Sequence, residues 1–198
     1  MHEKIEKSLK KLHSIIDDED RFYKENVREL LKSAGKKPPK VLYAAAFLDK
    51  GSREDLYNWW KMHVKEDTLG RVPKHSHMTI KWKPTPEEVL SLPIGEDDGK
   101  TVTVIGYAHD ELGQAVKVRV SDSSFDRMDE GHAHITISAS EDSDMGFKYS
   151  NYLLENGFEE VKSGPELKVR VGVFMTNGEV QFDLDDTSNE DDNIELEL

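Results

Sequence analysis

The chain has 198 residues, of which 36% are hydrophobic and 34% charged, and a formal net charge of −13. This length allows one buried core, and the acidity argues against a protein that coats nucleic acid through bulk charge. The absence of cysteine excludes disulfides and a thiolate nucleophile. Because the N-terminus lacks a signal-like apolar core and the longest apolar run is VLYAAAFL, we expect a cytoplasmic protein without a membrane segment.

The two ends of the chain differ in composition from its middle. Apolar residues recur at helical spacing between residues 3 and 34, and GKKPPK at 35–40 ends this pattern. Residues 1–39 are therefore predicted to form a helical extension. Residues 183–198 hold eight acids and no Lys or Arg, which is typical of a solvated, disordered tail. The alternative for residues 185–198 is a tail that docks on a partner or mimics an anionic substrate.

Residues 40–184 are predicted to form one α+β domain made of two similar halves. The first half has the patterns of a strand at 41–48, a helix with Ser52 as its N-cap, a strand at 75–82 and a short helix with Pro86 in its first turn. The second half has strands at 101–110, 114–120 and 131–139, a helix at 147–158 and a hairpin at 167–184. Strands outnumber helices, so mostly antiparallel sheet with flanking helices is expected.

A polar hexapeptide, H-x-H-x-T-I, occurs at 75–80 and again at 132–137. Side chains on a strand alternate between its two faces. The polar faces would carry His75, His77, Thr79 and Lys81 in the first copy, and His132, His134, Thr136 and Ser138 in the second. The opposite faces, with Met78, Ile80 and Trp82 in the first copy and Ile135 and Ile137 in the second, are expected in the core. If the two strands are neighbours, the polar rows share one groove.

Two histidines and two threonines in one groove suit phosphodiester chemistry. One imidazole can take a proton from the attacking water while the other donates a proton to the leaving oxygen. Threonine hydroxyls can hold the non-bridging phosphate oxygens. The candidate catalytic residues are therefore His77 and His134, and the candidate substrate-binding residues are Thr79, Thr136, Tyr43, which could stack a base, and Lys81, which could contact phosphate.

The tetrapeptides HMTI and HITI resemble the H-x-[ST]-x signature of the two-histidine phosphoesterases. This LigT-like group includes RNA 2′,3′-cyclic phosphodiesterases and the phosphodiesterase domain of tRNA ligases. The resemblance covers about residues 41–182, including YAAAFLDKGSREDLYNWW, and implies a bilobal fold whose two pseudo-symmetric lobes each supply one H-x-T strand. It also implies hydrolysis of a cyclic phosphate, or of a 2′–5′ or 3′–5′ linkage, in an RNA end or small cyclic nucleotide, without metal or cofactor. A monomer is expected.

Other interpretations stay open. Phage proteins that degrade cyclic oligonucleotide signals share both motifs, so a cyclic di- or oligonucleotide is an alternative substrate. A nucleotide- or RNA-binding module without catalysis is an alternative of another class. The two H-x-H pairs could bind Zn, Ni or Fe, although Lys81 is an unfavourable neighbour for a cation. Both histidines of the signature could also be half-buried structural residues.

Overall fold

The computed structural model of the protein describes residues 39–96 and 99–183. Two units are distinguished along the chain, Met1–Lys40 and Val41–Leu198, and the second contains the elements described below. The helices predicted within residues 1–39 and the tail predicted at 185–198 lie outside the described residues, apart from Pro39.

The domain follows the predicted order of strands and helices. Its strands are β1 (Val41–Leu48), β2 (His77–Trp82), β3 (Thr101–His109), β4 (Gly113–Val120), β5 (His134–Ala139), β6 (Glu159–Glu160), β7 (Glu166–Met175) and β8 (Val180–Gln181). Its helices are α2 (Lys50–His63), α3 (Pro86–Leu90) and α4 (Tyr149–Glu155), with short 3-10 turns η1 (Ser123–Phe125) and η2 (Gly146–Lys148). The α+β class is confirmed, although both H-x-T strands begin later than predicted. None of the helices in the described part of the chain is long and apolar enough to cross a membrane.

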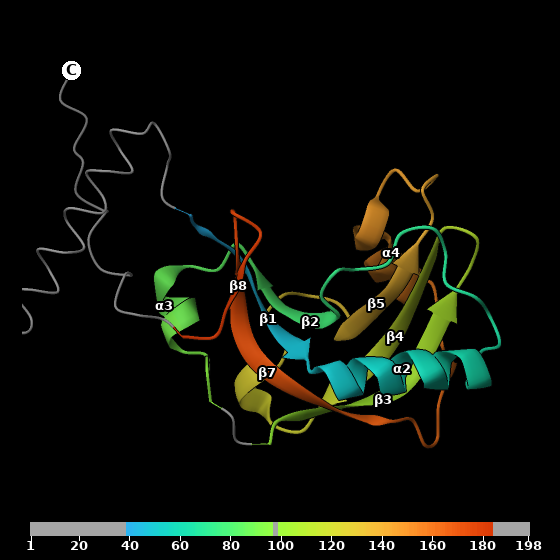
Figure 1. The fold of residues 1–198 in the computed structure, drawn as a ribbon, viewed down its shortest axis with the longest axis horizontal. Helices are drawn as coiled ribbons and strands as arrows, with labels where there is room; N and C mark the ends of the chain where they lie inside the picture. The colour runs from blue at the N-terminus through green and yellow to red at the C-terminus, as the bar shows by residue number, and fades with distance from the viewer. Residues whose placement is uncertain (1–38, 97–98, 184–198) are drawn as a thin grey trace, which may run out of the picture. The chain divides into compact units, whose positions relative to one another are not determined.

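The strands form one antiparallel sheet in the order β6-β3-β4-β5-β2-β1-β7-β8. β3 also pairs with β7, through 101–103 and 166–168, and this pairing closes six strands into a barrel. In Figure 1, β2 and β5 lie side by side in the centre, between the strands β1, β7 and β8 and the elements β4 and α4. The topology therefore makes the two H-x-T strands direct neighbours.

The hydrophobic core lies on the inner face of this barrel. The two H-x-T strands supply Met78, Ile80, Ile135 and Ile137, none of which has exposed surface, as the alternation predicts. α2 covers this core with the fully buried Trp60. Full burial of a Met or Ile side chain, such as those that the two H-x-T strands supply, stabilises the fold by roughly 1.5–3 kcal/mol. The apolar faces therefore fix which way β2 and β5 turn, and they hold the polar rows on the outer face.

The start of α2 differs from the prediction. Asp49, and not Ser52, is the N-cap, because the Asp49 carboxylate accepts a hydrogen bond from the Ser52 backbone N–H at 2.6 Å. The Ser52 hydroxyl instead accepts from the backbone N–H of Lys168 on β7, at 2.7 Å. Both residue types are good N-caps, and the bond to β7 decides between them. The prediction for α3 is confirmed, since Pro86 follows the N-cap Thr85.

Candidate functional site

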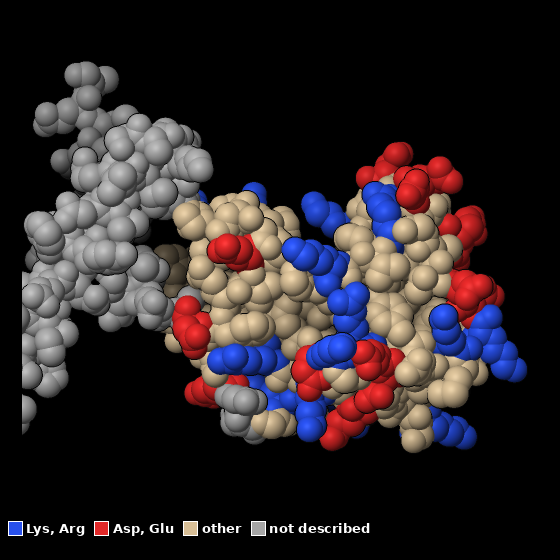
Figure 2. All heavy atoms as spheres, in the orientation of Figure 1, with Lys and Arg blue, Asp and Glu red and all other residues tan. Residues whose placement is uncertain are grey.

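The two H-x-T rows lie next to each other on the outer face of the barrel. β2 pairs with β5 in the antiparallel direction through Met78 and Ile135, whose side chains are in the core. This direction brings each histidine beside the threonine of the other row, His77 beside Thr136 and His134 beside Thr79. In Figure 2 the domain surface is hollowed between the wall of β1, β7 and β8 and the wall of α4, and Lys and Arg side chains gather in this groove.

Both candidate catalytic histidines are held by the same kind of backbone hydrogen bond. His77 Nδ1 donates to the carbonyl oxygen of His75 at 2.8 Å, and His134 Nδ1 donates to the carbonyl oxygen of His132 at 2.8 Å. A carbonyl oxygen can only accept, so each neutral ring carries its proton on Nδ1 and keeps the lone pair on Nε2. The first histidine of each hexapeptide therefore orients the second through its main chain.

The His77 ring lies among aromatic side chains. Its centroid is 4.9 Å from that of Tyr43, with planes 19° apart, and 5.5 Å from that of Phe47. Burial lowers the pKa of His77, although the bond to the His75 carbonyl acts in the opposite direction. Burial also raises the pKa of Tyr43 to about 12. Near pH 7, therefore, His77 is neutral in the free protein and Tyr43 keeps its phenolic proton.

The His134 ring lies beside Arg127. Arg127 Nη1 is 3.2 Å from His134 Nδ1 and donates to the His132 carbonyl oxygen and to Asn151 Oδ1, both at 2.9 Å. Because Nδ1 already donates to the same carbonyl, Arg127 meets a ring N–H, and this contact is not a hydrogen bond. Burial lowers the pKa of His134 to about 4, and the Arg127 charge adds to this shift. The sequence analysis missed Arg127, because a single arginine in a loop carries no motif.

The two threonines occupy equivalent positions but have different neighbours. Thr136 Oγ1 is 2.9 Å from Ser150 Oγ on α4, and Ser150 is buried. Thr79 is half-buried, and its hydroxyl has no hydrogen-bond partner within residues 39–96 and 99–183. Ser138, expected beside Thr136, is fully buried and donates to Gln114 at 2.6 Å. The polar row on β5 that faces the groove therefore ends at Thr136.

A bulge in β2 changes which side chains reach the groove. β1 and β2 are in register at Ala45 with Thr79 and again at Ala44 with Lys81, so Ile80 is an extra residue on β2. Such a bulge adds one residue to a strand and reverses the alternation beyond it. The part of β2 after the bulge therefore presents the opposite side chains from those that period-two counting predicts.

The bulge corrects two placements. Lys81 does not lie on the histidine face, because it pairs with a residue that faces the core, and its ammonium is 3.0 Å from Asp129 and 3.4 Å from Glu88. Trp82 does not face the core, because it is in register with Tyr43 and its ring centroid is 5.7 Å from that of Tyr43. The groove thus gains an aromatic ring in place of the expected cation.

The first histidine of each H-x-H pair has its ring beside an aromatic neighbour. The His75 ring is 6.3 Å from that of Phe174, and the His132 ring is 5.5 Å from that of Phe158. Among the described residues, no three His, Cys, Asp or Glu side chains are grouped so that they could hold a metal ion. The metal-site interpretation therefore has no ligand set in this part of the chain.

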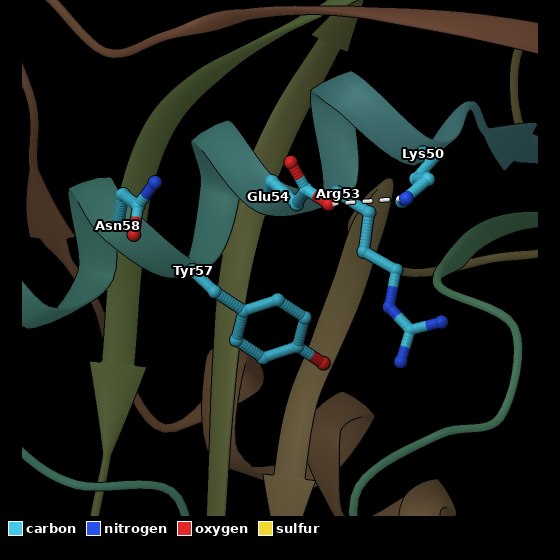
Figure 3. Close-up of a pocket in the computed structure, with 5 residues that line it drawn as sticks. All are labelled: Lys50, Arg53, Glu54, Tyr57 and Asn58. Atoms are coloured by element: carbon cyan, nitrogen blue, oxygen red, sulfur yellow. Dashed lines mark ion pairs between the residues drawn. The ribbon is translucent and has the colours of Figure 1, made fainter.

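A separate open pocket of about 570 Å³ lies along α2, and its lining residues are Lys50, Arg53, Glu54, Tyr57 and Asn58 (Figure 3). The Tyr57 hydroxyl donates to the carbonyl of Ile137 on β5 at 3.3 Å, and Arg53 donates to the carbonyl of Lys74 at 3.1 Å. These bonds hold α2 against β5 and against the segment before β2. The pocket contains none of the predicted site residues, so the candidate site is the groove and not this pocket.

The groove gathers most of the residues that the sequence singled out. His77, His134, Thr79, Thr136 and Tyr43 lie together on its floor, and Lys81 does not join them. The structure adds one cation beside His134 and one aromatic ring beyond Tyr43. Compared with known proteins, the chain matches no protein-family model and no curated protein.

Proposed function

We propose that the protein is a two-histidine phosphoesterase that hydrolyses a nucleotide phosphodiester without a metal ion. The observation that supports this proposal is the pair of H-x-T rows on adjacent strands, with each histidine anchored through Nδ1 in the same way. Structural histidines satisfied one by one by their surroundings would not need the same anchor on two neighbouring strands. The leading substrate is the 2′,3′-cyclic phosphate of an RNA end or of a nucleotide.

The chemistry is a displacement at phosphorus with two proton transfers. A water oxygen attacks phosphorus while the water proton passes to the Nε2 of one imidazole. The bond from phosphorus to the leaving oxygen breaks, and this oxygen takes a proton from the Nε2–H of the other ring. The products are a phosphomonoester and a free hydroxyl. Thr79 and Thr136 donate hydrogen bonds to the non-bridging oxygens, where negative charge increases in the transition state.

The surroundings of the two rings favour His134 as the proton acceptor and His77 as the donor. The Arg127 guanidinium beside His134 disfavours a second positive charge on that ring. His77 instead has the rings of Tyr43 and Phe47 as neighbours, and aromatic faces attract cations. A bound phosphate anion raises the proton affinity of nearby imidazoles, so the phosphate supplies the condition under which His77 becomes charged.

The sheet order supports the bilobal arrangement that the motif resemblance implies. Outward from the β2–β5 pair, each side repeats a long neighbour (β1 or β4), a strand of the barrel closure (β7 or β3) and a two-residue edge strand (β8 or β6). We propose on this basis that the domain has two pseudo-symmetric lobes, each of which contributes one H-x-T strand to the groove.

The test is a substrate panel assayed in the presence of EDTA. It contains nucleoside 2′,3′-cyclic phosphates, RNA with a cyclic phosphate end, and cyclic di- and oligonucleotides, with His77→Ala and His134→Ala as controls for contaminating nucleases. We expect turnover of the first two groups. Turnover of cyclic oligonucleotides alone would assign the protein to the signal-degrading class. Nucleotide binding without any turnover would contradict catalysis, and turnover that requires an added metal would contradict the metal-free mechanism.

A further inference from the structure

The open pocket along α2 presents a cation toward the segment before β2. Arg53 extends from the same side of α2 as Tyr57, whereas the side chains of Lys50 and Glu54 are turned to each other, 3.9 Å apart (Figure 3). Arg53 Nη1 donates to the Lys74 carbonyl at 3.1 Å, and this bond uses one of the five N–H donors of a guanidinium. Among the described residues, no carboxylate forms an ion pair with Arg53. The guanidinium therefore has donors left for an anion.

Lys74 supplies a second positive charge at the same place. Its side chain is exposed, and its ammonium has no ion pair or hydrogen bond in the part of the chain that the structure describes. Because Arg53 is bonded to the carbonyl of this residue, both cations lie at the segment that leads into β2. Like charges on neighbouring side chains repel each other, and an anion bound between them would relieve this repulsion.

Both cations lie close to the first histidine hexapeptide. Burial lowers the pKa of His75, and the charges of Lys74 and Arg53 lower it further. The carbonyl oxygen of His75 in turn holds the ring of His77. In Figure 2, Lys and Arg side chains continue from the groove toward the region of α2. The two cations therefore lie at the end of the groove where β2 begins.

The proposed chemistry places the nucleoside of the substrate at this end. His77 gives its proton to the leaving oxygen, which in a 2′,3′-cyclic phosphate belongs to the ribose. An RNA strand continues from that ribose through its 5′ carbon to the next backbone phosphate. Lys74 is three residues from His77, and three residues of extended chain span at most roughly 11 Å, which a short stretch of RNA can bridge. The next phosphate can therefore reach Lys74 and Arg53.

We propose that Arg53 and Lys74 form a second phosphate site, which binds the backbone phosphate on the 5′ side of an RNA strand that ends in a 2′,3′-cyclic phosphate. This inference rests on the proposed function, which takes the cyclic phosphate to lie between His77 and His134. The planar fork of Arg53 can hold two phosphate oxygens, and Lys74 adds a point charge. Contacts to phosphate carry no sequence information, so the site selects an RNA end over a mononucleotide without selecting among bases.

Binding of product-like ligands tests the second phosphate site without any need for turnover. The ligands are adenosine 2′-monophosphate and a triadenylate that ends in a 2′-phosphate, and isothermal titration calorimetry measures both affinities. We expect the wild-type protein to bind the triadenylate roughly tenfold more tightly, the scale of a hydrogen bond to a charged group. In Lys74→Met this preference should be lost, and the slope of log K against log salt for the triadenylate should become shallower by about 0.7. Equal wild-type affinities for the two ligands, or a preference that Lys74→Met keeps in full, would overturn the proposal.

Matched variants separate a site from the overall charge of α2. Lys61 is in the last turn of this helix and does not line the pocket. Lys61→Met removes the same charge as Lys74→Met and should keep the wild-type preference for the triadenylate. Arg53→Lys keeps a cation without the guanidinium fork and should lose part of the preference. A loss in Lys61→Met as large as in Lys74→Met would show that no defined phosphate site exists, and would overturn the proposal.

Turnover distinguishes failure of this site from failure of the proposed function. The ratio of kcat/KM for a triadenylate with a 2′,3′-cyclic phosphate end to that for adenosine 2′,3′-cyclic phosphate should fall roughly tenfold in Lys74→Met. An equal kcat/KM for the two substrates in the wild-type protein would overturn the second phosphate site and leave the proposed function intact. A preference in binding that depends on Lys74, without hydrolysis of either substrate, would contradict the proposed function and leave the second phosphate site intact.

Discussion

The four histidines of the two hexapeptides differ in which of their groups shapes the site, the side chain or the backbone carbonyl. His77 and His134 present their rings to the groove, whereas His75 and His132 supply carbonyl groups. Replacing either His77 or His134 with Ala should lower kcat by roughly 100-fold or more, the usual contribution of a general acid or base. The fold should persist because neither ring lies in the hydrophobic core. Steady-state kinetics with the substrate found in the panel, together with near-UV circular dichroism, measure both effects.

The preceding histidines provide matched controls within the same segments. Alanine keeps the backbone carbonyl, so His75→Ala and His132→Ala should still anchor the rings of His77 and His134 and keep kcat within a few-fold of wild type. A loss in these variants as large as in His77→Ala would mean that the side chains, and not the carbonyl groups, do the work.

The charge of Arg127 should set the pH at which kcat/KM falls on the acidic side. Burial and the guanidinium of Arg127 both lower the pKa of His134, so the ring stays neutral to low pH and, under the proposed function, could still accept a proton there. In Arg127→Met this charge is lost, and the pKa of His134 should move up toward its usual range. Because kcat/KM falls when the free enzyme's base becomes protonated, its acidic limb should shift to higher pH. The pH dependence of kcat/KM, or an NMR titration of the His134 ring, measures this shift.

Arg71 is a suitable control for Arg127. It also holds β5 in place by donating to main-chain carbonyls, those of Ser140 and Ser143, but at the far end of the strand. Arg71→Met should therefore lower stability and leave the acidic limb where it is. If Arg127→Met reduces activity equally at all pH values and the acidic limb of kcat/KM does not move, Arg127 has only a structural role and does not set the pKa of His134.

The junction of β5 with α4 distinguishes the two threonines. Thr136→Val removes the only described partner of the buried Ser150 hydroxyl and should cost roughly 1–3 kcal/mol of unfolding free energy. Within the described part of the chain, Thr79→Val leaves no other hydroxyl without its hydrogen-bond partner, so this change should affect stability little. Under the proposed function both changes should lower kcat/KM, because each would remove a hydrogen-bond donor to the phosphate. Urea unfolding and kinetics separate the two effects. Equal unfolding free energies of Thr136→Val and Thr79→Val would contradict a stabilising hydrogen bond between Thr136 and Ser150.

Alternation along single strands could be predicted, whereas pairing between strands could not. The core faces of β2 and β5 follow from period two, and Met78 and Ile135 are buried as expected. The faces of Lys81 and Trp82 depend on a bulge that exists only because β2 must match β1. Arg127 reaches His134 from the loop before β5, where its guanidinium also donates to Asn151 on α4. Long-range pairing therefore decides the parts of the site that the local pattern misses.

Closure of the barrel depends on a close approach between Gly164, just before β7, and Val104 on β3. A Cβ on Gly164 would overlap the carbonyl oxygen of Val104 on β3, and the Val104 N–H donates to the Pro165 carbonyl at 3.1 Å. Gly164→Ala should push β3 away from β7 and lower the unfolding free energy by roughly 1–3 kcal/mol, as overpacking does. Thermal or urea unfolding measures this change.

A glycine in a helix provides the comparison. A Cβ on Gly51 of α2 would have its nearest neighbour, Asp49 Oδ1, at 3.6 Å, so Gly51→Ala should stabilise the protein by up to about 1 kcal/mol through helix propensity. The two substitutions add the same methyl group and should move stability in opposite directions. A Gly164→Ala protein as stable as wild type would show that β3 and β7 tolerate more separation than the closed barrel suggests.

The seam between β2 and β5 is the least paired joint between strands in the described sheet. Met78 with Ile135 is the one register pair recorded there, whereas the ladders on either side, β1 with β2 and β4 with β5, each run through five. Separating β2 from β5 breaks fewer hydrogen bonds than separating β1 from β2 or β4 from β5. We therefore expect local opening of the sheet to occur at this seam before either half unfolds. Such opening would change the spacing between His77 on β2 and His134 on β5. Under the proposed function, a phosphate held by both rows would link β2 to β5 across this seam, so that substrate binding would also hold His77 and His134 at a fixed spacing.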